Sequence, residues 1–344
     1  MKSLHSIVEK MRRKPSDVVG IDLTPQATYA VRMKKSVPDP TVVATAVLPA
    51  APFPEQKDGD GESQGSLALP SAVRARYACL SLVGDQAAIK LITLPGTLDP
   101  GDEERIINSL GVNNAAEYRI GYKVLARGHG KTESRTLAVA LPEKEARTAL
   151  SLFETGLPVP YTVEVSHLAT MTAFLSTTGK THDKEAIGLL LLGHDMSAFA
   201  LFNNSVLVLF RRFGIGLSAF VANVTQARGV DNETAMHIIE DGSFDISQAV
   251  EEILSPLERQ LILSRDFVER RDNCHVEEIH VAGELMRSPD VLQELSESIG
   301  MKLIPWNPTE NLQIADGDWP EELVGQEWRW GAAIGTCLGA FEEV

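Results

Sequence analysis

The sequence predicts an α/β protein with two domains, and three observations lead to this prediction. Apolar runs with strand character alternate with helical patterns in both halves of the chain, which is typical of α/β folds. A chain of 344 residues is too long for one ordinary hydrophobic core. Two similar strand, turn and strand units, which begin at Val18 and Ala186, stand about 170 residues apart and indicate a duplicated core.

In the first half of the chain, short apolar runs bounded by turn residues predict strands. These runs cover residues 18–22, 29–33, 41–48, 77–83, 87–94, 120–126, 136–141 and 159–165. Helices are predicted to start near Pro100 and at Pro142, and a third covers residues 167–175. Two strands, a helix, two strands and a helix between residues 77 and 157 predict a separate subdomain, and the residues rich in Pro, Gly, Asp and Glu at 49–65 predict a flexible loop.

The second half repeats this alternation. Strands are predicted at residues 186–192, 198–202, 205–210, 278–283 and 302–305. The helices predicted between and after them are one that ends at Gly229, one capped by Asp231, a long one at 247–270, one that ends at Gly300 and a small-residue helix at 328–341. We therefore divide the chain into a first lobe (18–76), a subdomain (77–157), a return to the first lobe with a connector (158–185), a second lobe (186–330) and a C-terminal helix (331–344).

The bulk composition limits the partners and cofactors that we expect. With a formal net charge of −15, the chain lacks the clustered basic residues that neutralise phosphates, so we expect no nucleic-acid partner. The three cysteines lack CxxC spacing, and none of the eight histidines has a partner at ligand spacing. We therefore expect neither a disulfide framework nor a zinc site.

The beginning of the chain bears on localisation. No run approaches the roughly 20 apolar residues that span a bilayer, and the first residues lack the apolar block of a signal peptide, so we expect a cytoplasmic protein. Residues 1–17 combine basic side chains with an apolar helical face. Two interpretations stay open: a segment that rests on anionic lipid or a partner, and a solvated terminal helix.

Candidate ligand-binding residues stand at strand ends and turns. Asp22 ends its strand, where a carboxylate can hold a hydrated magnesium ion, although an Asx turn or a cap explains it equally well. Gly193, Gly214 and Gly216 flank the second hairpin, where backbone N–H groups of glycine-containing turns can point at a phosphate. Each glycine also has a plain interpretation as a turn residue.

Several strings, in this order and spacing, resemble the actin-like ATPase superfamily and, within it, the PilM family of type IV pilus assembly proteins, which is related to FtsA. The similar strings are Val-Val-Gly-Ile-Asp at 18–22, Arg-Arg-Phe-Gly-Ile-Gly at 211–216, Leu-Glu-Arg-Gln-Leu-Ile-Leu-Ser-Arg-Asp-Phe at 257–267, Glu-Ile-His-Val-Ala-Gly at 278–283, Ser-Pro at 288–289 and Trp-Asn-Pro at 306–308. The resemblance covers nearly the whole chain.

The resemblance implies two actin-like lobes, each with a ribonuclease-H-like core, the inserted subdomain at 77–157 and an insertion at about 217–247. It also implies ATP with magnesium as the ligand, bound between the lobes, with Asp22 toward the metal. The residues that it places around the nucleotide are Asp22, Thr24, Gly193, Gly214, Gly216 and Gly283. The implied partner is the N-terminal tail of a PilN-like inner-membrane protein, which would hold the chain at the inner face of the inner membrane.

The sequence departs from the family pattern where the nucleotide would bind. Thr24 and Pro25 stand in the first phosphate turn, Leu191 replaces a carboxylate, and Glu284 and Leu285 replace glycines of the adenosine loop. Gln260 replaces a glutamate, and Ser166 stands where a carboxylate often positions water. We therefore expect no catalytic residues, no required cofactor and a scaffold with a degenerate ATPase cleft. The alternatives are an active ATPase and an FtsA-like, membrane-tethered protein that associates with itself into filaments.

Overall fold

The computed structural model describes residues 14–51, 66–96, 102–127, 133–153, 156–241, 247–315 and 319–342. Residues 1–13 of the predicted basic segment and residues 52–65 of the predicted loop lie outside this part of the chain. The chain divides into two compact units. Unit 1 consists of Met1–Gly84, Glu143–Thr177 and Pro308–Val344, and unit 2 consists of Asp85–Pro142 and Thr178–Asn307.

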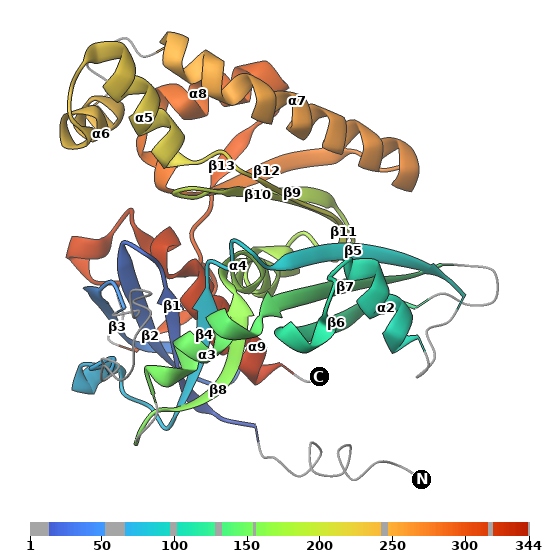
Figure 1. Cartoon of the computed structure of the whole chain (residues 1–344), viewed down its shortest axis with the longest axis vertical. Coiled ribbons are helices and arrows are strands. Elements are labelled where there is room, and N and C mark those ends of the chain that lie inside the picture. Colours follow the sequence, from blue (N-terminus) through green and yellow to red (C-terminus); the bar gives the residue numbers. More distant parts are fainter. Residues whose placement is uncertain are drawn as a thin grey trace. The chain divides into compact units, whose positions relative to one another are not determined.

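Unit 1 is built on a six-stranded sheet with the order β14-β3-β2-β1-β4-β8 (Figure 1). The strands are β1 (Asp17–Leu23), β2 (Ala27–Lys34), β3 (Thr41–Pro49), β4 (Tyr77–Leu82), β8 (Val159–Val165) and β14 (Gln313–Ile314). The first three strands form an antiparallel meander, whereas β4 runs parallel to β1 and β8 runs parallel to β4. The register places Asp22 of β1 opposite Ser81 of β4.

Helices α4 (Ser166–Ser176) and α9 (Gly331–Phe341) pack in unit 1 through small residues. A Cβ added to Gly335 would lie 1.8 Å from the carbonyl oxygen of Ala169 in α4. A Cβ added to Gly20 of β1 would lie 1.9 Å from the carbonyl oxygen of Ala333 in α9. Only glycine permits such an approach of two backbones, so these residues set the spacing between α9, α4 and the sheet. Unit 1 also contains α3 (Glu143–Ser151), η1 (Ser71–Val73), η5 (Glu321–Leu323) and η6 (Glu327–Trp330).

Unit 2 contains a five-stranded sheet with the order β11-β10-β9-β12-β13. Its strands are β9 (Ala186–Leu192), β10 (Ser197–Asn203), β11 (Val206–Phe213), β12 (Val276–Gly283) and β13 (Leu303–Pro305). Again an antiparallel meander comes first, and β12 and β13 follow in parallel. Setting aside the short β14, the two sheets have the same strand order, as the predicted duplication requires.

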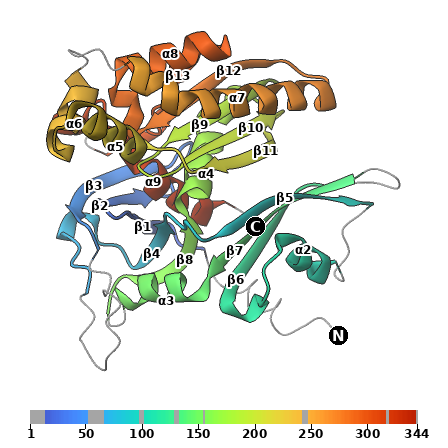
Figure 2. The ribbon, with the colours of Figure 1, turned by 45° about the horizontal axis from the view of Figure 1, so that its top comes forward.

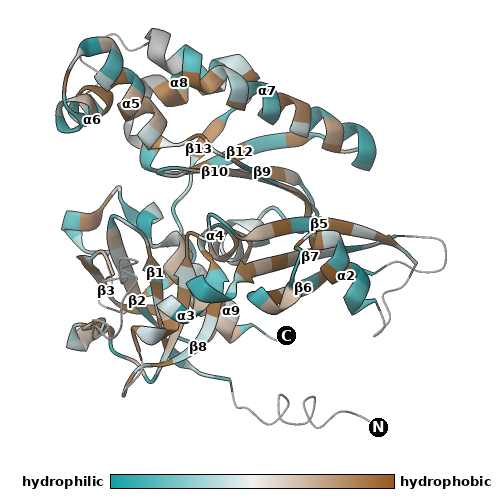
Figure 3. Cartoon of the chain, in the orientation of Figure 1, coloured by the Kyte–Doolittle hydropathy of each residue, from teal (hydrophilic) through white to brown (hydrophobic). Residues whose placement is uncertain are grey.

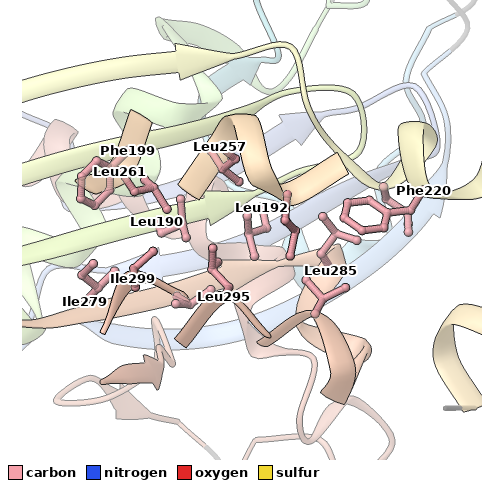
Figure 4. Close-up of a cluster of buried hydrophobic side chains, with 14 of the residues drawn as sticks. Leu190, Leu192, Phe199, Phe220, Leu257, Leu261, Ile279, Leu285, Leu295 and Ile299 are labelled. Atoms are coloured by element: carbon pink, nitrogen blue, oxygen red, sulfur yellow. The ribbon is translucent and has the colours of Figure 1, made fainter. Parts of the chain in front are cut away.

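Helices cover one face of this sheet and close the core of unit 2 (Figures 1 and 4). They are α5 (Leu217–Arg228), α6 (Asn232–Asp241), α7 (Ser247–Asp272) and α8 (Pro289–Ile299). Unit 2 also contains η3 (Thr178–Lys180) before β9 and η4 (Glu284–Arg287) after β12. The core contains large side chains, among them Phe199 of β10, Phe220 of α5 and Leu257 of α7. Figure 3 shows hydrophilic and hydrophobic residues alternating along α7, the pattern of a helix with one buried face.

A three-stranded antiparallel sheet with the order β5-β7-β6 belongs to unit 2 as well (Figure 2). Its elements are β5 (Ala88–Pro95), β6 (Tyr118–Ala126), β7 (Glu133–Pro142), α2 (Glu103–Leu110) and η2 (Ala115–Glu117). Ile106 and Leu110 of α2 are buried in the same apolar cluster as Ala138 and Ala140 of β7. Two contacts tie this sheet to the rest of unit 2: Arg212 donates a hydrogen bond to the carbonyl of Ala87, and Arg135 lies 3.8 Å from Asp272.

The structure differs from the predicted bounds of two domains. The subdomain predicted at 77–157 loses its first strand, because β4 pairs with β1 in the sheet of unit 1, and α3 also belongs to unit 1. The second lobe predicted at 186–330 ends near Asn307. Residues after this point return to unit 1, where β14 pairs with β3 and the ring of Trp330 packs edge-on against Tyr29 at 5.4 Å. Among the described residues, no helix combines the length and the apolarity needed to cross a membrane.

Candidate functional site

In unit 1, the candidate site is the buried carboxyl group of Asp22 near the end of β1. Asp22 is 6% exposed, and its Oδ1 accepts two hydrogen bonds. The hydroxyl of Ser81 in β4 donates one at 2.7 Å, and the hydroxyl of Ser166, the first residue of α4, donates the other at 2.6 Å. The parallel pairing of β4 with β1 and the start of α4 after β8 bring the three side chains together.

Burial raises the pKa of Asp22 to about 6, although the hydrogen bonds from Ser166 and Ser81 favour the ionised form and oppose this shift. The carboxyl group therefore changes charge just below neutral pH. Ser166 stands where the family often has a carboxylate. Here its hydroxyl donates a hydrogen bond to the carboxyl group of Asp22.

The turn after β1 uses its own hydrogen-bonding groups. The hydroxyl of Thr24 donates to the carbonyl of Ala27 at 2.8 Å and accepts the N–H of Ala27 at 3.2 Å. The N–H of Thr24 also donates to the carbonyl of Ala27, at 3.1 Å, and Pro25 has no N–H. An anion at this turn would have to displace the bonds at Thr24 and Ala27.

In unit 2, three of the candidate glycines meet at one place, which we name the glycine junction: Gly193, Gly216 and Gly283. A Cβ on Gly216 would lie 2.3 Å from the carbonyl oxygen of His194 and 2.7 Å from that of Gly193. Gly283 ends β12 with φ of +124° and stands against the backbone of Leu192. Close backbone approach therefore requires glycine at these positions, independently of any ligand.

The fourth candidate, Gly214, differs from the junction glycines. It is exposed, and a Cβ added to it would meet nothing within 4 Å. Nothing in its surroundings requires glycine.

The N-terminus of α5 lies against the glycine junction. The N–H of Leu217 donates to the carbonyl of Gly193 at 3.0 Å, and the N–H of Ser218 donates to the carbonyl of His194 at 2.9 Å. Free N–H groups in the first turn make a helix N-terminus an anion site. Here the first two of them are bonded to backbone carbonyls.

A glutamate of the loop after β12 contacts a histidine of the turn after β9, and sequence reasoning missed this contact. Nδ1 of His194 lies 3.0 Å from Oε2 of Glu284, so the side chain of Glu284 is held at the turn that follows β9. Leu285, which also replaces a glycine of the family pattern, is fully buried in the apolar core of unit 2 (Figure 4).

The surroundings of Gln260 and Leu191, which also differ from the family pattern, are as follows. The side-chain oxygen of Gln260 accepts a hydrogen bond from Arg211 at 3.0 Å. Leu191 is 8% exposed and lies within β9, whereas Asp195, the acidic residue of the following turn, is exposed. Asp22 and Thr24 thus belong to unit 1, and Gly193, Gly214, Gly216 and Gly283 belong to unit 2.

Two sheets with the same strand order, each an antiparallel meander followed by two parallel strands, define a duplicated α/β protein of the actin-like class. Among solved structures, the chain is similar to the PilM-PilN type IV pilus biogenesis complex, with a TM-score of 0.76 and 16% sequence identity over 96% of this chain and 100% of that chain. The predicted actin-like fold of the PilM kind is therefore confirmed.

Two further solved structures are similar over most of their length. A Bacteroides thetaiotaomicron protein with an actin-like ATPase fold gives a TM-score of 0.46 at 10% identity, over 86% of this chain and 93% of that chain. Ethanolamine utilization protein EutJ from Carboxydothermus hydrogenoformans gives 0.44 at 11% identity, over 96% and 93%. No protein-family model matches the sequence. No curated protein matches it either.

Proposed function

We propose that this protein is a PilM-like adaptor in a type IV pilus or type II secretion-like assembly. It acts in the cytoplasm at the inner face of the inner membrane, where it binds the short tail of a membrane protein. The observation that carries this proposal is the similarity in fold, at a TM-score of 0.76 over 96% of the chain, to a PilM whose solved structure is a complex with PilN.

We further propose that the nucleotide cleft of the actin-like fold is degenerate and does not hydrolyse ATP. In unit 1, the bonds within the turn at Thr24 and the absent N–H of Pro25 reduce the donors available to a phosphate. In unit 2, the first N–H groups of α5 are bonded to the carbonyls of Gly193 and His194, and β9 ends without a carboxylate. Phosphoryl transfer depends on placed charge and metal, and loss of one electrostatic contact commonly costs about 100-fold in rate.

Whether the residues around Asp22 can hold magnesium with ATP distinguishes the adaptor from an active ATPase. Asp22 supplies one carboxylate, but its Oδ1 already accepts two hydroxyl hydrogen bonds, and its burial favours the neutral form. A hydrated magnesium ion is usually held by one or two ionised carboxylates together with phosphate oxygens. These residues fit a catalytic magnesium site poorly, and no catalytic role is assigned to them.

Binding of a membrane-partner tail tests the adaptor directly. The full chain is titrated calorimetrically with a synthetic peptide of the cytoplasmic tail of an inner-membrane protein encoded beside it. The control peptide has the same composition in scrambled order. The proposal expects saturable binding at one site for the native tail and none for the scrambled tail. Failure of every neighbouring tail to bind would contradict it.

An active actin-like ATPase is the second candidate, and the buried Asp22 with the glycine junction favours it. Titration of the magnesium-supplied protein with ATP and with a slowly hydrolysed analogue separates the two. Binding without phosphate release would indicate an adaptor that nucleotide stabilises, whereas turnover would indicate the enzyme. An FtsA-like tether predicts that removal of residues 1–17 abolishes binding to anionic liposomes.

A further inference from the structure

A group of three side chains that could bind a metal lies in unit 2, on β12 and on the connection before β9. Among the described residues, His182, Glu278 and His280 each offer one ligand atom, and these atoms all lie within 4.8 Å of one another. We propose that these three side chains bind a divalent transition metal ion of the zinc class. We name the group the histidine–glutamate site.

Strand geometry explains two of the ligands. Glu278 and His280 are two residues apart on β12, so their side chains point to the same face of the sheet. The alternate residues Ile279 and Val281 point to the other face and are buried in the apolar core. Nε2 of His280 lies 2.8 Å from Oε1 of Glu278, so the two ligand atoms already face each other.

The third ligand comes from the connection before β9. Nε2 of His182 lies 3.8 Å from Oε1 of Glu278, and the rings of His182 and His280 have their centroids 5.8 Å apart. In a tetrahedral zinc site with bonds of about 2.0 to 2.1 Å, neighbouring ligand atoms are about 3.3 Å apart. The two distances to Glu278 lie on either side of this value, so small side-chain rotations would complete the site.

A second carboxylate orients His182. Its Nδ1 lies 2.5 Å from Oε2 of Glu185, which leaves Nε2 directed at Glu278. A carboxylate on the far nitrogen of a histidine ligand is the arrangement that fixes the ring and raises its basicity in metal sites. An isolated pair of histidine and glutamate does not need this second carboxylate, and its presence favours a metal site.

The connection that carries His182 is held in place by its own hydrogen bonds. The indole N–H of Trp306 donates to Thr178, the hydroxyl of Ser205 donates to the carbonyl of Gly179, and the N–H of Asn204 donates to the carbonyl of Glu185. His182 therefore approaches β12 from a segment fixed at both ends. Such support is what keeps ligands within reach of a metal.

Charge and access also suit a cation. Two carboxylates, Glu185 and Glu278, lie beside the histidines, and Lys302 is a basic neighbour of His280. The side chains of His182 and Glu278 are 26% and 20% exposed, so an ion can enter from solvent, while His280 is buried at 8%. Two imidazoles and one carboxylate favour zinc, copper or nickel over magnesium, which prefers oxygen ligands. A bound ion would link the connection before β9, which carries His182, to strand β12, which carries Glu278 and His280.

The test is calorimetric titration of the full chain, without a polyhistidine tag, with Zn²⁺ alone. We expect one ion per chain, unaffected by a large excess of Mg²⁺, and an absorption spectrum of four-coordinate cobalt when Co²⁺ replaces Zn²⁺. His182→Asn should weaken zinc binding by about 100-fold or more, because loss of a residue that only hydrogen-bonds to a metal ligand already weakens binding by about 10- to 100-fold. Glu185→Gln should weaken it by about 10-fold.

The matched control is His275→Asn. His275 also pairs with a carboxylate, Glu269, at 2.9 Å, but within the part of the chain that the structure describes it belongs to no group of three possible ligands. The variant His275→Asn should leave zinc binding unchanged. Melting curves in a chelator keep folding separate from binding, because His182→Asn should melt like the parent chain there. Absence of zinc binding by the parent chain, or equal binding by His182→Asn, would overturn the proposal.

Discussion

The two large sheets share one strand order, but helices pack against them in different ways. In unit 1, the helices approach by backbone contact, with Gly335 against Ala169 and Gly20 against Ala333. In unit 2, large side chains such as Phe199 and Phe220 fill the space between the sheet and its helices. The comparison teaches that a duplicated topology does not fix how its layers are packed. Backbone contacts at glycine set the spacing around α9 in unit 1, whereas large side chains set the spacing between the sheet and its helices in unit 2.

The ends of the equivalent strands β1 and β9 differ in the same manner. β1 presents a buried carboxyl group that two serine hydroxyls hold, whereas β9 leads into a glycine whose carbonyl accepts the N–H of Leu217. One end therefore depends on a titrating side chain and the other on backbone geometry. Four substitutions test these two comparisons, and they follow in order of decreasing effect.

Gly335→Ala should have the largest effect. The new Cβ would lie 1.8 Å from a backbone oxygen, so α9 and α4 must separate, and we expect a loss of about 3 kcal/mol or more in unfolding free energy. Gly339→Ala in the same helix is the matched control, because its nearest contact is 3.5 Å away, and it should stabilise the protein by about 0.5 to 1 kcal/mol. Urea unfolding measures both, and equal effects would contradict the backbone-contact account of unit 1.

Asp22→Asn should stabilise the protein above pH 6 and remove a pH dependence. The folded pKa of Asp22, about 6, exceeds the ordinary aspartate value of 3.8, so the folded state holds a proton between these values that the unfolded state has released. Unfolding free energy therefore falls as pH rises through this window, and the loss is complete above it. The magnitude is about 2 to 3 kcal/mol, and asparagine keeps the Oδ1 acceptor. Stability profiles from pH 4 to 8 check it, and parallel profiles for both proteins would refute the assignment.

Gly216→Ala should cost about 1 to 3 kcal/mol, because its Cβ would lie 2.3 Å from the carbonyl oxygen of His194 at the start of α5. Gly214→Ala, two residues earlier, meets nothing within 4 Å and should change stability little. Thermal melts of the two variants compare them directly. A large effect at Gly214 would mean that this glycine has a role that its surroundings do not reveal.

Glu284→Ala should have the smallest effect, below about 1 kcal/mol, because the side chains of His194 and Glu284, which contact each other, are 30% and 28% exposed. The same variant asks whether this glutamate hinders nucleotide binding. Calorimetry with ATP should give the same absence of strong binding before and after the substitution. Micromolar binding by the variant alone would show that one side chain, rather than the turns, blocks the ligand.

Much of the fold could be predicted from the sequence because its strands and helices carry strong local patterns. The apolar run from Ala186 to Leu192 became the central strand β9, with every residue buried. Gly229 ends α5 in the left-handed conformation, and the carboxylate of Asp231 accepts the N–H of Thr234 at the start of α6. Periodicity and capping are local properties, so a single sequence reveals them.

Long-range pairing could not be read in the same way. Nothing local in residues 77–82 distinguishes a strand that joins β1 from one that joins β5, and the return of the chain after Asn307 to unit 1 depends on packing at Tyr29. His182 and His280 are far apart in sequence, so their proximity could not be read from the spacing of histidines. The one local signal was the spacing of Glu278 and His280, which places both on one face of a strand.

The measurement that tests the central claim most directly is phosphate release from magnesium-ATP by the full chain, with and without the membrane-partner tail. The adaptor account predicts release no faster than in buffer under both conditions, while the same preparation binds the tail. Steady turnover that Asp22→Asn abolishes would contradict it, because the carboxyl group at the end of β1 would then serve a working ATPase.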